Sequence, residues 1–213
     1  MRRVRYSEER KRRQSSDVRF GEQEPRAVDA TKPPDTFLIV CEGEKTEPNY
    51  FKGFKLPSAD VQVIGLGANT TNLVEKAIKL KNEKFSDKQQ YWCVFDRDSF
   101  PAQNFNAALD NAKKNGFRVA YSNEAFELWY LLHFNYYDAA LSRTAYPDKL
   151  SALLRFKYTK NSNTIYNVLE DKQDTAIKNA RKLLVSYGAA HNPETDNPST
   201  TVHLLVEQLI AQL

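Results

Sequence analysis

Carboxylates follow two apolar stretches of this chain at the point where each stretch ends. Glu42 comes directly after the run Phe37–Cys41, and Asp96 and Asp98 follow the run Tyr91–Phe95. Short apolar runs bounded by turn signals are typical of strands buried on both faces of a parallel sheet. The carboxyl ends of such strands form the edge at which open α/β sheets bind ligands. We therefore expect the three carboxylates to gather at one edge.

Carboxylates gathered in this way repel one another unless a cation lies between them. Oxygen ligands alone suit a hard ion, Mg²⁺ or Mn²⁺, rather than zinc. Each half of the pattern is ambiguous by itself. A strand-end Glu-Gly is often an ordinary turn, and Asp-x-Asp also occurs in haloacid-dehalogenase phosphatases and glycosyltransferases. The two halves together, on separate strands, predict a metal site.

Strands and helices alternate along the first part of the chain. Apolar runs predict four strands, at 37–41, 61–64, 91–95 and 117–121. Helical patterns follow them, at about 46–56, after 71, at 105–115 and at 124–134. Strict alternation favours a parallel sheet with helices on its faces, so the predicted fold class is α/β. After Tyr136 only helices are expected, at 147–156, 174–187 and 200–213.

The length of 213 residues suffices for one well-cored domain, and the composition of 41% hydrophobic and 27% charged residues is ordinary for a globular protein. We expect a basic, flexible arm at 1–34, an α/β domain at 35–135 and a helical elaboration at 136–213. The formal net charge is +4, and seven basic residues lie among the first thirteen. Such a block is usually a solvated tail and less often a contact with nucleic acid.

No apolar stretch approaches the length of a membrane span, and the N-terminus lacks the apolar core of a signal peptide. The simplest interpretation is a cytoplasmic protein that does not contact a membrane. Cys41 and Cys93 fall inside predicted strands and lack metal-ligand spacing. They are expected to be reduced core residues.

The two acidic strand ends together resemble the Toprim domain of topoisomerases, primases and overcoming-lysogenization-defect (OLD) nucleases. The longer sequence motifs around these strand ends are similar to those of the RloB family. This resemblance runs from about Thr36 to the C-terminus. It rests on four stretches, which are CEGEKTEPNYF at 41–51, FDRD at 95–98, SNEAFELWYLLHF at 122–134 and NPSTTVH at 197–203.

This resemblance implies a Toprim-like fold and a Mg²⁺-dependent nuclease. Asp96 and Asp98 would hold the metal, which polarises the scissile phosphate and lowers the pKa of an attacking water. Glu42 would bind the metal or act as general base or acid. Glu127 would belong to a second metal site, with Glu124 behind it. The resemblance also implies a role in anti-phage abortive infection beside an ABC- or AAA-type ATPase.

Several residues near the acidic strand ends could have a structural role instead of a role in catalysis or binding. Glu47 is expected to stabilise the positive end of the next helix, with Thr46 as its N-cap. Lys45 either contacts a phosphate of a nucleic acid or is a solvated loop cation. Tyr158 and Lys160 are expected to line a nucleic-acid groove, because basic and aromatic residues together bind backbone and bases.

The three histidines have simple explanations, since His133 is expected to be structural and His191 incidental, while a functional role for His203 stays open. His133 ends an apolar helix, and His191 lies in a polar loop. His203 shares a helical face with Glu207, four residues further on, and packing is the simpler explanation for that pair.

Two other functions fit the sequence. The chain could be a binding or effector subunit that is gated by its ATPase partner and has little catalysis of its own. It could also be a phosphatase or sugar-nucleotide transferase in which Asp96 is the nucleophile or a diphosphate ligand, but that scheme leaves Glu42 without a role. DNA and RNA both remain open as substrates, and a homodimer is expected from the Toprim resemblance.

Overall fold

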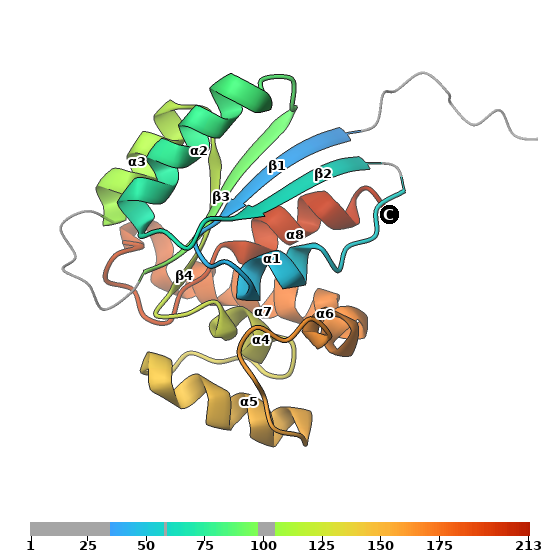
Figure 1. Cartoon of the computed structure of the whole chain (residues 1–213). Helices are drawn as coiled ribbons and strands as arrows, with labels where there is room; N and C mark the ends of the chain where they lie inside the picture. Colours follow the sequence, from blue (N-terminus) through green and yellow to red (C-terminus); the bar gives the residue numbers. More distant parts are fainter. Residues whose placement is uncertain (1–34, 58, 98–104) are drawn as a thin grey trace, which may run out of the picture. The chain divides into compact units, whose positions relative to one another are not determined.

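Four parallel strands form one sheet in the computed structural model, which describes residues 35–57, 59–97 and 105–213 (Figure 1). In spatial order β2-β1-β3-β4, the strands are β2 (Ala59–Gly65), β1 (Asp35–Cys41), β3 (Gln90–Arg97) and β4 (Arg118–Asn123). Helices cover both faces, so the predicted α/β class with a parallel sheet is confirmed.

The alternation of side chains along β1 divides the apolar core between the two faces of the sheet. Phe37, Ile39 and Cys41 join one cluster of buried side chains, and Leu38 and Val40 join the other. Successive residues of a strand point to opposite faces, so a run that is apolar at every position needs cover on both sides. This is why the continuous run at 37–41 predicts a central strand.

Two helices cover the face of the sheet that holds Leu38 and Val40. They are α2 (Thr70–Lys84) and α3 (Phe105–Lys114), which contribute Leu73, Val74 and Leu109 to that core. The Asn69 side chain caps α2 by accepting a hydrogen bond from the Asn72 N–H at 3.1 Å.

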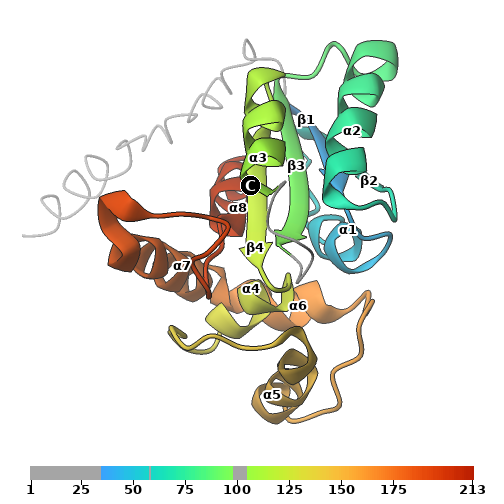
Figure 2. The same ribbon diagram turned by 90° about the vertical axis from the view of Figure 1, so that its left-hand side faces the viewer.

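The opposite face carries the remaining helices, which form the larger apolar cluster. Figures 1 and 2 show α4, α5 and α6 beyond the carboxyl ends of the strands and α8 along the sheet. The helices of this layer are α1 (Thr46–Phe51), α4 (Glu127–Leu132), α5 (Tyr146–Leu154), α6 (Ile165–Leu169), α7 (Gln173–Tyr187) and α8 (Val202–Ile210).

The segment 199–201 lies against the outer edge of β4. The N–H of Thr201 donates to the carbonyl of Tyr121 at 2.9 Å, and the N–H of Asn123 donates to the carbonyl of Ser199 at 2.8 Å. The Thr201 hydroxyl accepts from the Tyr121 N–H at 3.0 Å and donates to the Val119 carbonyl at 3.1 Å. Residues 80 positions apart in the sequence thus satisfy the backbone of the edge strand.

Both cysteines are buried and free, as predicted. In the described part of the chain, no helix combines the length and the apolar character that crossing a membrane requires.

Candidate functional site

The register of the sheet brings Glu42 to Asp96. Cys41 pairs with Val94 across β1 and β3, and the N–H of Glu42 continues this ladder by donating to the Val94 carbonyl at 2.8 Å. The Glu42 carboxylate accepts the N–H of Asp96 at Oε2 (3.0 Å) and the hydroxyl of Thr70 at Oε1 (3.3 Å). The structure therefore places these two acids together at the carboxyl edge of the sheet.

Asp96 is buried among other acids. Its side chain is 6% exposed, and Arg143 Nη2 lies 3.7 Å from its Oδ2. Its Oδ1 is buried without a hydrogen-bond partner among the described residues. Burial, followed by Glu47, Glu127 and Glu42, raises the pKa of Asp96 well above its ordinary value, and Arg143 opposes the shift.

Glu47 belongs to the site, although its sequence position does not predict this. It lies in the first turn of α1, but its side chain is buried, and its Oε2 has no hydrogen-bond partner in the described residues. Burial and Glu127 raise its pKa, while Lys160 and Arg143 lower it. The expectation that Glu47 only stabilises a helix end is incomplete, because its carboxylate belongs to the acidic site.

Gly43 makes the position of Glu47 possible. A Cβ atom at this residue would overlap the Glu47 carboxylate. Glu42 therefore supplies one acid of the site. Gly43, which has no side chain, leaves room for the carboxylate of Glu47 from α1.

Glu127 completes the set from the first turn of α4. It is 4% exposed, and its Oε1 accepts the hydroxyl of Tyr158 at 3.1 Å. Tyr158 is itself buried, so the prediction that it lines a nucleic-acid groove is wrong. Its ring packs inside the molecule, and its hydroxyl orients an acid of the site.

Two further residues, Glu124 and Tyr146, lie near the acids of the site. Glu124 has a left-handed backbone with φ of 71°, and Phe126 occupies the N-cap position of α4. Its N–H donates to the Arg97 carbonyl at 2.9 Å, which extends the β3–β4 ladder. Tyr146 is fully buried, and its hydroxyl has no partner in the described chain. Burial, then Glu124, Asp96 and Glu127, raises the pKa of that hydroxyl.

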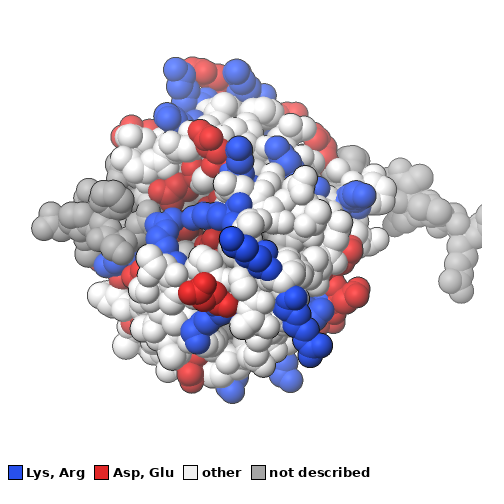
Figure 3. All heavy atoms as spheres, turned by 60° about the horizontal axis from the view of Figure 1, so that its bottom comes forward, with Lys and Arg blue, Asp and Glu red and all other residues white. Residues whose placement is uncertain are grey.

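We refer to Glu42, Glu47, Asp96 and Glu127 as the acidic cluster. Burial raises the pKa of Glu42 to about 7, with a smaller contribution from Glu47. Arg143 and Lys160 act in the opposite direction on these acids. Lys and Arg side chains form a band across the middle of the face shown in Figure 3, with acidic atoms between them. The basic groups beside the acids are Arg143, 3.7 Å from Asp96, and Lys160, which lowers the pKa of Glu47.

The donor chemistry of the acidic cluster fits a hard cation. All of its donors are carboxylate oxygens, and the Oδ1 of Asp96 and the Oε2 of Glu47 are buried without a partner in the described chain. Within residues 35–57, 59–97 and 105–213, no group of three or more acids, histidines or cysteines is close enough to hold a metal ion as placed. Asp98, the third predicted ligand, lies outside the described residues.

Lys45 and Lys160 are both exposed, and their contact with nucleic acid stays a prediction. Lys160 is held near the acids by its neighbour Asn161. The Thr46 hydroxyl donates to Asn161 Oδ1 at 2.9 Å, and the amide of Asn49 donates to the Asn161 carbonyl at 3.0 Å. The prediction of Thr46 as N-cap is wrong, since Lys45 takes that position and the Thr46 hydroxyl bridges to the distant loop.

The histidines lie away from the acidic cluster's hydrogen bonds. Burial lowers the pKa of His133 and of His203 to about 4. Glu207 pairs with Arg181 at 2.8 Å. His191, expected to be incidental, has two partners. Its Nδ1 lies 2.6 Å from Asp196 Oδ2, and its Nε2 lies 2.7 Å from the Tyr121 hydroxyl.

A comparison with curated proteins gives no match. The family model described as RloB-like protein matches residues 37–209, which include every member of the acidic cluster, Arg143 and Lys160. Since the match spans most of the chain, the protein belongs to the RloB-like family.

Proposed function

We propose that this protein is a Mg²⁺- or Mn²⁺-dependent nuclease that hydrolyses phosphodiester bonds of DNA or RNA. The observation that carries the proposal is the acidic cluster, in which two buried carboxylate oxygens have no partner among the described residues and basic side chains stand beside them. Three buried acids and the partly buried Glu42 thus lie together, and burial raises the pKa of Glu42, Glu47 and Asp96, so the bare site disfavours their charged forms and a bound cation would offset this penalty.

The chain's own residues divide into two roles under this proposal. Asp96, Glu47 and Glu127 would hold the cation, with Asp98 as a further ligand contributed by the segment after β3. When bound, the metal would polarise the scissile phosphate and lower the pKa of an attacking water. Tyr158 would keep the Glu127 carboxylate in a fixed orientation through its hydroxyl.

Glu42 is the best candidate for proton transfer. Its pKa of about 7 lies near the operating pH, where a general base works best. The N–H of Asp96 and the hydroxyl of Thr70 occupy one oxygen each, so the carboxylate is held in a single orientation. It would accept the proton of the attacking water.

Arg143 and Lys160 would bind the phosphates of the substrate. Arg143 reaches Asp96 with an ion pair of 3.7 Å while its side chain remains 40% exposed, so its guanidinium faces both the acids and the solvent. A guanidinium in such a position can form paired hydrogen bonds with a phosphate. Lys45, exposed at the start of α1, would extend this basic border along the nucleic acid.

The proposal includes the biological setting implied by the resemblance to the RloB family. In that setting the protein is the effector of an anti-phage defence system and acts with an ABC- or AAA-type ATPase encoded nearby. The alternative is a binding or effector subunit that is gated by this partner and has little catalysis of its own.

A nuclease assay tests the proposal directly. Plasmid, single-stranded DNA and total tRNA are incubated with the protein in Mg²⁺, Mn²⁺ or EDTA, with and without the ATPase. We expect metal-dependent cleavage that Asp96→Asn and Glu47→Gln abolish. Glu44→Gln is the matched control, because Glu44 lies in the same loop but is exposed. Cleavage in EDTA, or full cleavage by both cluster variants, would contradict the assignment.

A metal-binding measurement distinguishes a site that binds no metal from a site that binds metal but cleaves only with the ATPase. Mn²⁺ binding followed by electron paramagnetic resonance requires no turnover. Binding by the unsubstituted chain that Asp96→Asn removes, together with cleavage only in the presence of the ATPase, would support the gated alternative. Absence of Mn²⁺ binding would exclude the metal-dependent mechanism.

A further inference from the structure

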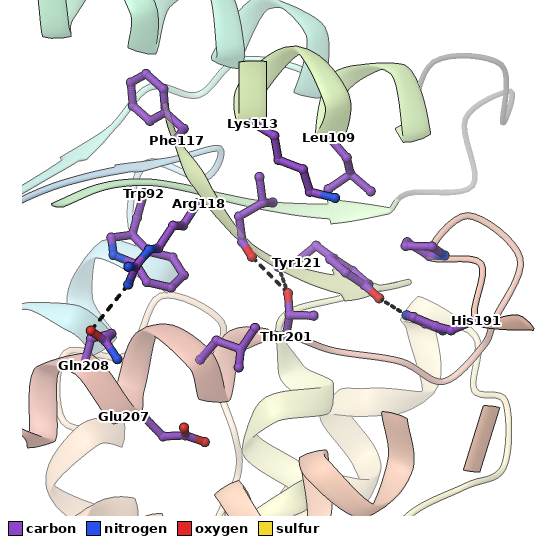
Figure 4. Close-up of a pocket in the computed structure, with 13 residues that line it drawn as sticks. Trp92, Leu109, Lys113, Phe117, Arg118, Tyr121, His191, Thr201, Glu207 and Gln208 are labelled. Carbon is purple, nitrogen blue, oxygen red and sulfur yellow. Dashed lines mark hydrogen bonds between the residues drawn. The ribbon is translucent and has the colours of Figure 1, made fainter. Parts of the chain in front are cut away.

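A cavity lies along the outer side of β4. Its volume is about 520 Å³, and α3, β4, the loop at 191–193 and α8 line it, with no contribution from the acidic cluster (Figure 4). This volume falls within the roughly 300–1,000 Å³ typical of small-molecule sites. We call it the β4 pocket.

The walls of the β4 pocket are mainly apolar and aromatic. Phe117, Tyr121 and Trp92 contribute rings, and Leu109 from α3 and Leu204 from α8 contribute aliphatic side chains. Leu204 is 42% exposed, so the α8 side of the pocket presents apolar surface to whatever enters. Walls of this kind favour a flat apolar body over a hydrated ion.

Arg118 gives the pocket an oriented positive charge. Its guanidinium lies 5.6 Å from the centre of the Trp92 ring, and its Nη1 donates to Gln90 Oε1 at 3.3 Å and to Gln208 Oε1 at 3.4 Å. Figure 4 shows Arg118 directed toward Trp92 and Gln208 on one side of the pocket. These contacts restrict the side chain before any ligand arrives, which reduces the entropic cost of binding.

Lys113 adds a second positive charge, and the acid that lines the pocket is already neutralised. Lys113 extends from α3 toward the cavity and is exposed (Figure 4). Glu207 is paired with Arg181, with contacts of 2.8 Å and 3.0 Å. The charge remaining at the described lining residues is therefore positive, which selects an anionic ligand.

A rigid polar group forms the other end of the pocket. Nδ1 of His191 lies 2.6 Å from the Asp196 carboxylate, and Nε2 of His191 lies 2.7 Å from the Tyr121 hydroxyl. The Asp196 carboxylate also accepts the N–H of Asn192 at 2.8 Å. These bonds fasten the loop at 191–196 to β4 and keep the pocket wall in place.

We propose that the β4 pocket binds a nucleoside monophosphate. The phosphate would contact Arg118, the planar base would pack against the apolar wall that includes Leu109 and Tyr121, and Lys113 would add its positive charge on the α3 side of the pocket. The combination of two cations with aromatic and aliphatic walls matches a ligand with an anionic end and a flat apolar end. This site is separate from the acidic cluster, so the proposal does not depend on nuclease activity.

Isothermal titration calorimetry on the full chain tests the proposal. AMP, GMP, CMP and UMP are titrated in EDTA, with adenosine and inorganic phosphate as partial ligands. We expect at least one monophosphate to bind more tightly than either partial ligand. Arg118→Gln should weaken that binding by about tenfold or more, because a charge-assisted contact contributes at least ~1.4 kcal/mol.

Three variants make the result specific to the pocket. Lys113→Ala should weaken binding, and Lys114→Ala, its exposed neighbour outside the pocket, should not. Asp96→Asn should bind as the unsubstituted chain does, since the acidic cluster is not involved. Thermal melts of each variant verify that it folds.

Several outcomes would overturn the proposal. They are the absence of binding by all four monophosphates, unchanged affinity in both Arg118→Gln and Lys113→Ala, and loss of binding in Asp96→Asn. Inorganic phosphate binding as tightly as the monophosphates would also overturn it, because the base would then contribute nothing.

Discussion

Gly43 and Glu47 illustrate how one small residue determines the position of an acid. Because the Glu47 carboxylate occupies the space where a Gly43 side chain would begin, the two positions depend on each other. This coupling cannot be recognised in the sequence, where Glu47 is simply an acid in the first turn of a helix. Its burial becomes evident only from packing across α1 and α4.

Gly43→Ala should displace the Glu47 carboxylate while the sheet remains intact. We expect a loss of about 1–3 kcal/mol in the free energy of unfolding, the usual cost of forcing extra atoms into a packed site. We also expect at least a tenfold loss of Mn²⁺ affinity. Urea unfolding and electron paramagnetic resonance measure the two effects, and Glu44→Ala in the same loop is the control. Unchanged Mn²⁺ affinity would show that Glu47 is not a ligand.

The raised pKa of Glu42 makes the stability of the metal-free protein depend on pH. The folded value of about 7 exceeds the ordinary value of 4.5, so the folded state binds the proton more tightly than the unfolded state. This contribution is fully present below about pH 4.5 and is lost as the pH rises through 7. Relative to Glu42→Gln, the unsubstituted chain should lose on the order of 2–3 kcal/mol between about pH 5 and pH 8.

The buried histidines change the free energy of unfolding with pH in the opposite direction. The comparison with Glu42→Gln removes their contribution, because both proteins contain them. The folded pKa values of His133 and His203, about 4, lie below the ordinary value of 6.5. Their contribution is therefore lost as the pH falls from 6.5 toward 4, equally in both proteins. Urea unfolding in EDTA across this range gives the difference, and parallel curves for the two proteins would show that Glu42 is not shifted.

The segment between α5 and α6 is the element that completes the acidic cluster. It supplies Tyr158 to Glu127 and places Lys160 beside Glu47, and the Asn161 contacts fasten it to the start of α1. Arg155 and Asn161 have left-handed backbones, with φ of 60° and 71°, at the two ends of this turn. The segment has no regular structure of its own, so its position depends on side-chain contacts.

Tyr158→Phe tests this element by removing one hydroxyl. The Glu127 carboxylate would remain buried without its donor, which should cost about 1–3 kcal/mol of stability and reduce metal-dependent cleavage. Tyr166→Phe is the matched control, because the Tyr166 hydroxyl makes only a 3.5 Å contact with Glu170 in a less buried setting. Equal effects of the two substitutions on stability and cleavage would argue against a special role for Tyr158.

The strands were predictable from the sequence because local patterns determine them. The runs at 37–41 and 91–95 are apolar at every position, and their acidic ends meet as expected from a parallel sheet. The helix α6, only five residues long, is too short to show a periodic pattern and was missed. The contacts of Arg143 with Asp96 and of Tyr158 with Glu127 could not be predicted, because both residues reach the site through tertiary packing and no local signal marks them.

At the scale of the whole molecule, the acidic cluster connects distant parts of the chain. Glu42 and Asp96 end two strands, Glu127 begins α4, and Arg143 and Lys160 come from the region after the last strand. A cation bound among these groups would bind the folded chain and not the unfolded one. Metal should therefore stabilise the fold as a whole.

Mg²⁺ and Mn²⁺ should raise the melting temperature of the unsubstituted protein relative to EDTA. At a metal concentration of about 100 times Kd, the expected stabilisation is about 2.7 kcal/mol. Asp96→Asn should abolish the shift, and Glu44→Gln should preserve it. Differential scanning fluorimetry over a range of metal concentrations measures it, and a shift of equal size in Asp96→Asn would place the metal elsewhere.

The hydrogen bonds between segment 199–201 and β4 also restrict how two copies of this protein can assemble. An edge strand with unpaired amides is a template onto which a strand from another molecule can add. Residues 199–201 already satisfy backbone groups of Val119, Tyr121 and Asn123, so this edge is closed to such addition over most of its length. The other edge of the sheet is β2. A dimer that continued its sheet from one copy into the next would therefore form through β2, on the side of the sheet opposite the β4 pocket.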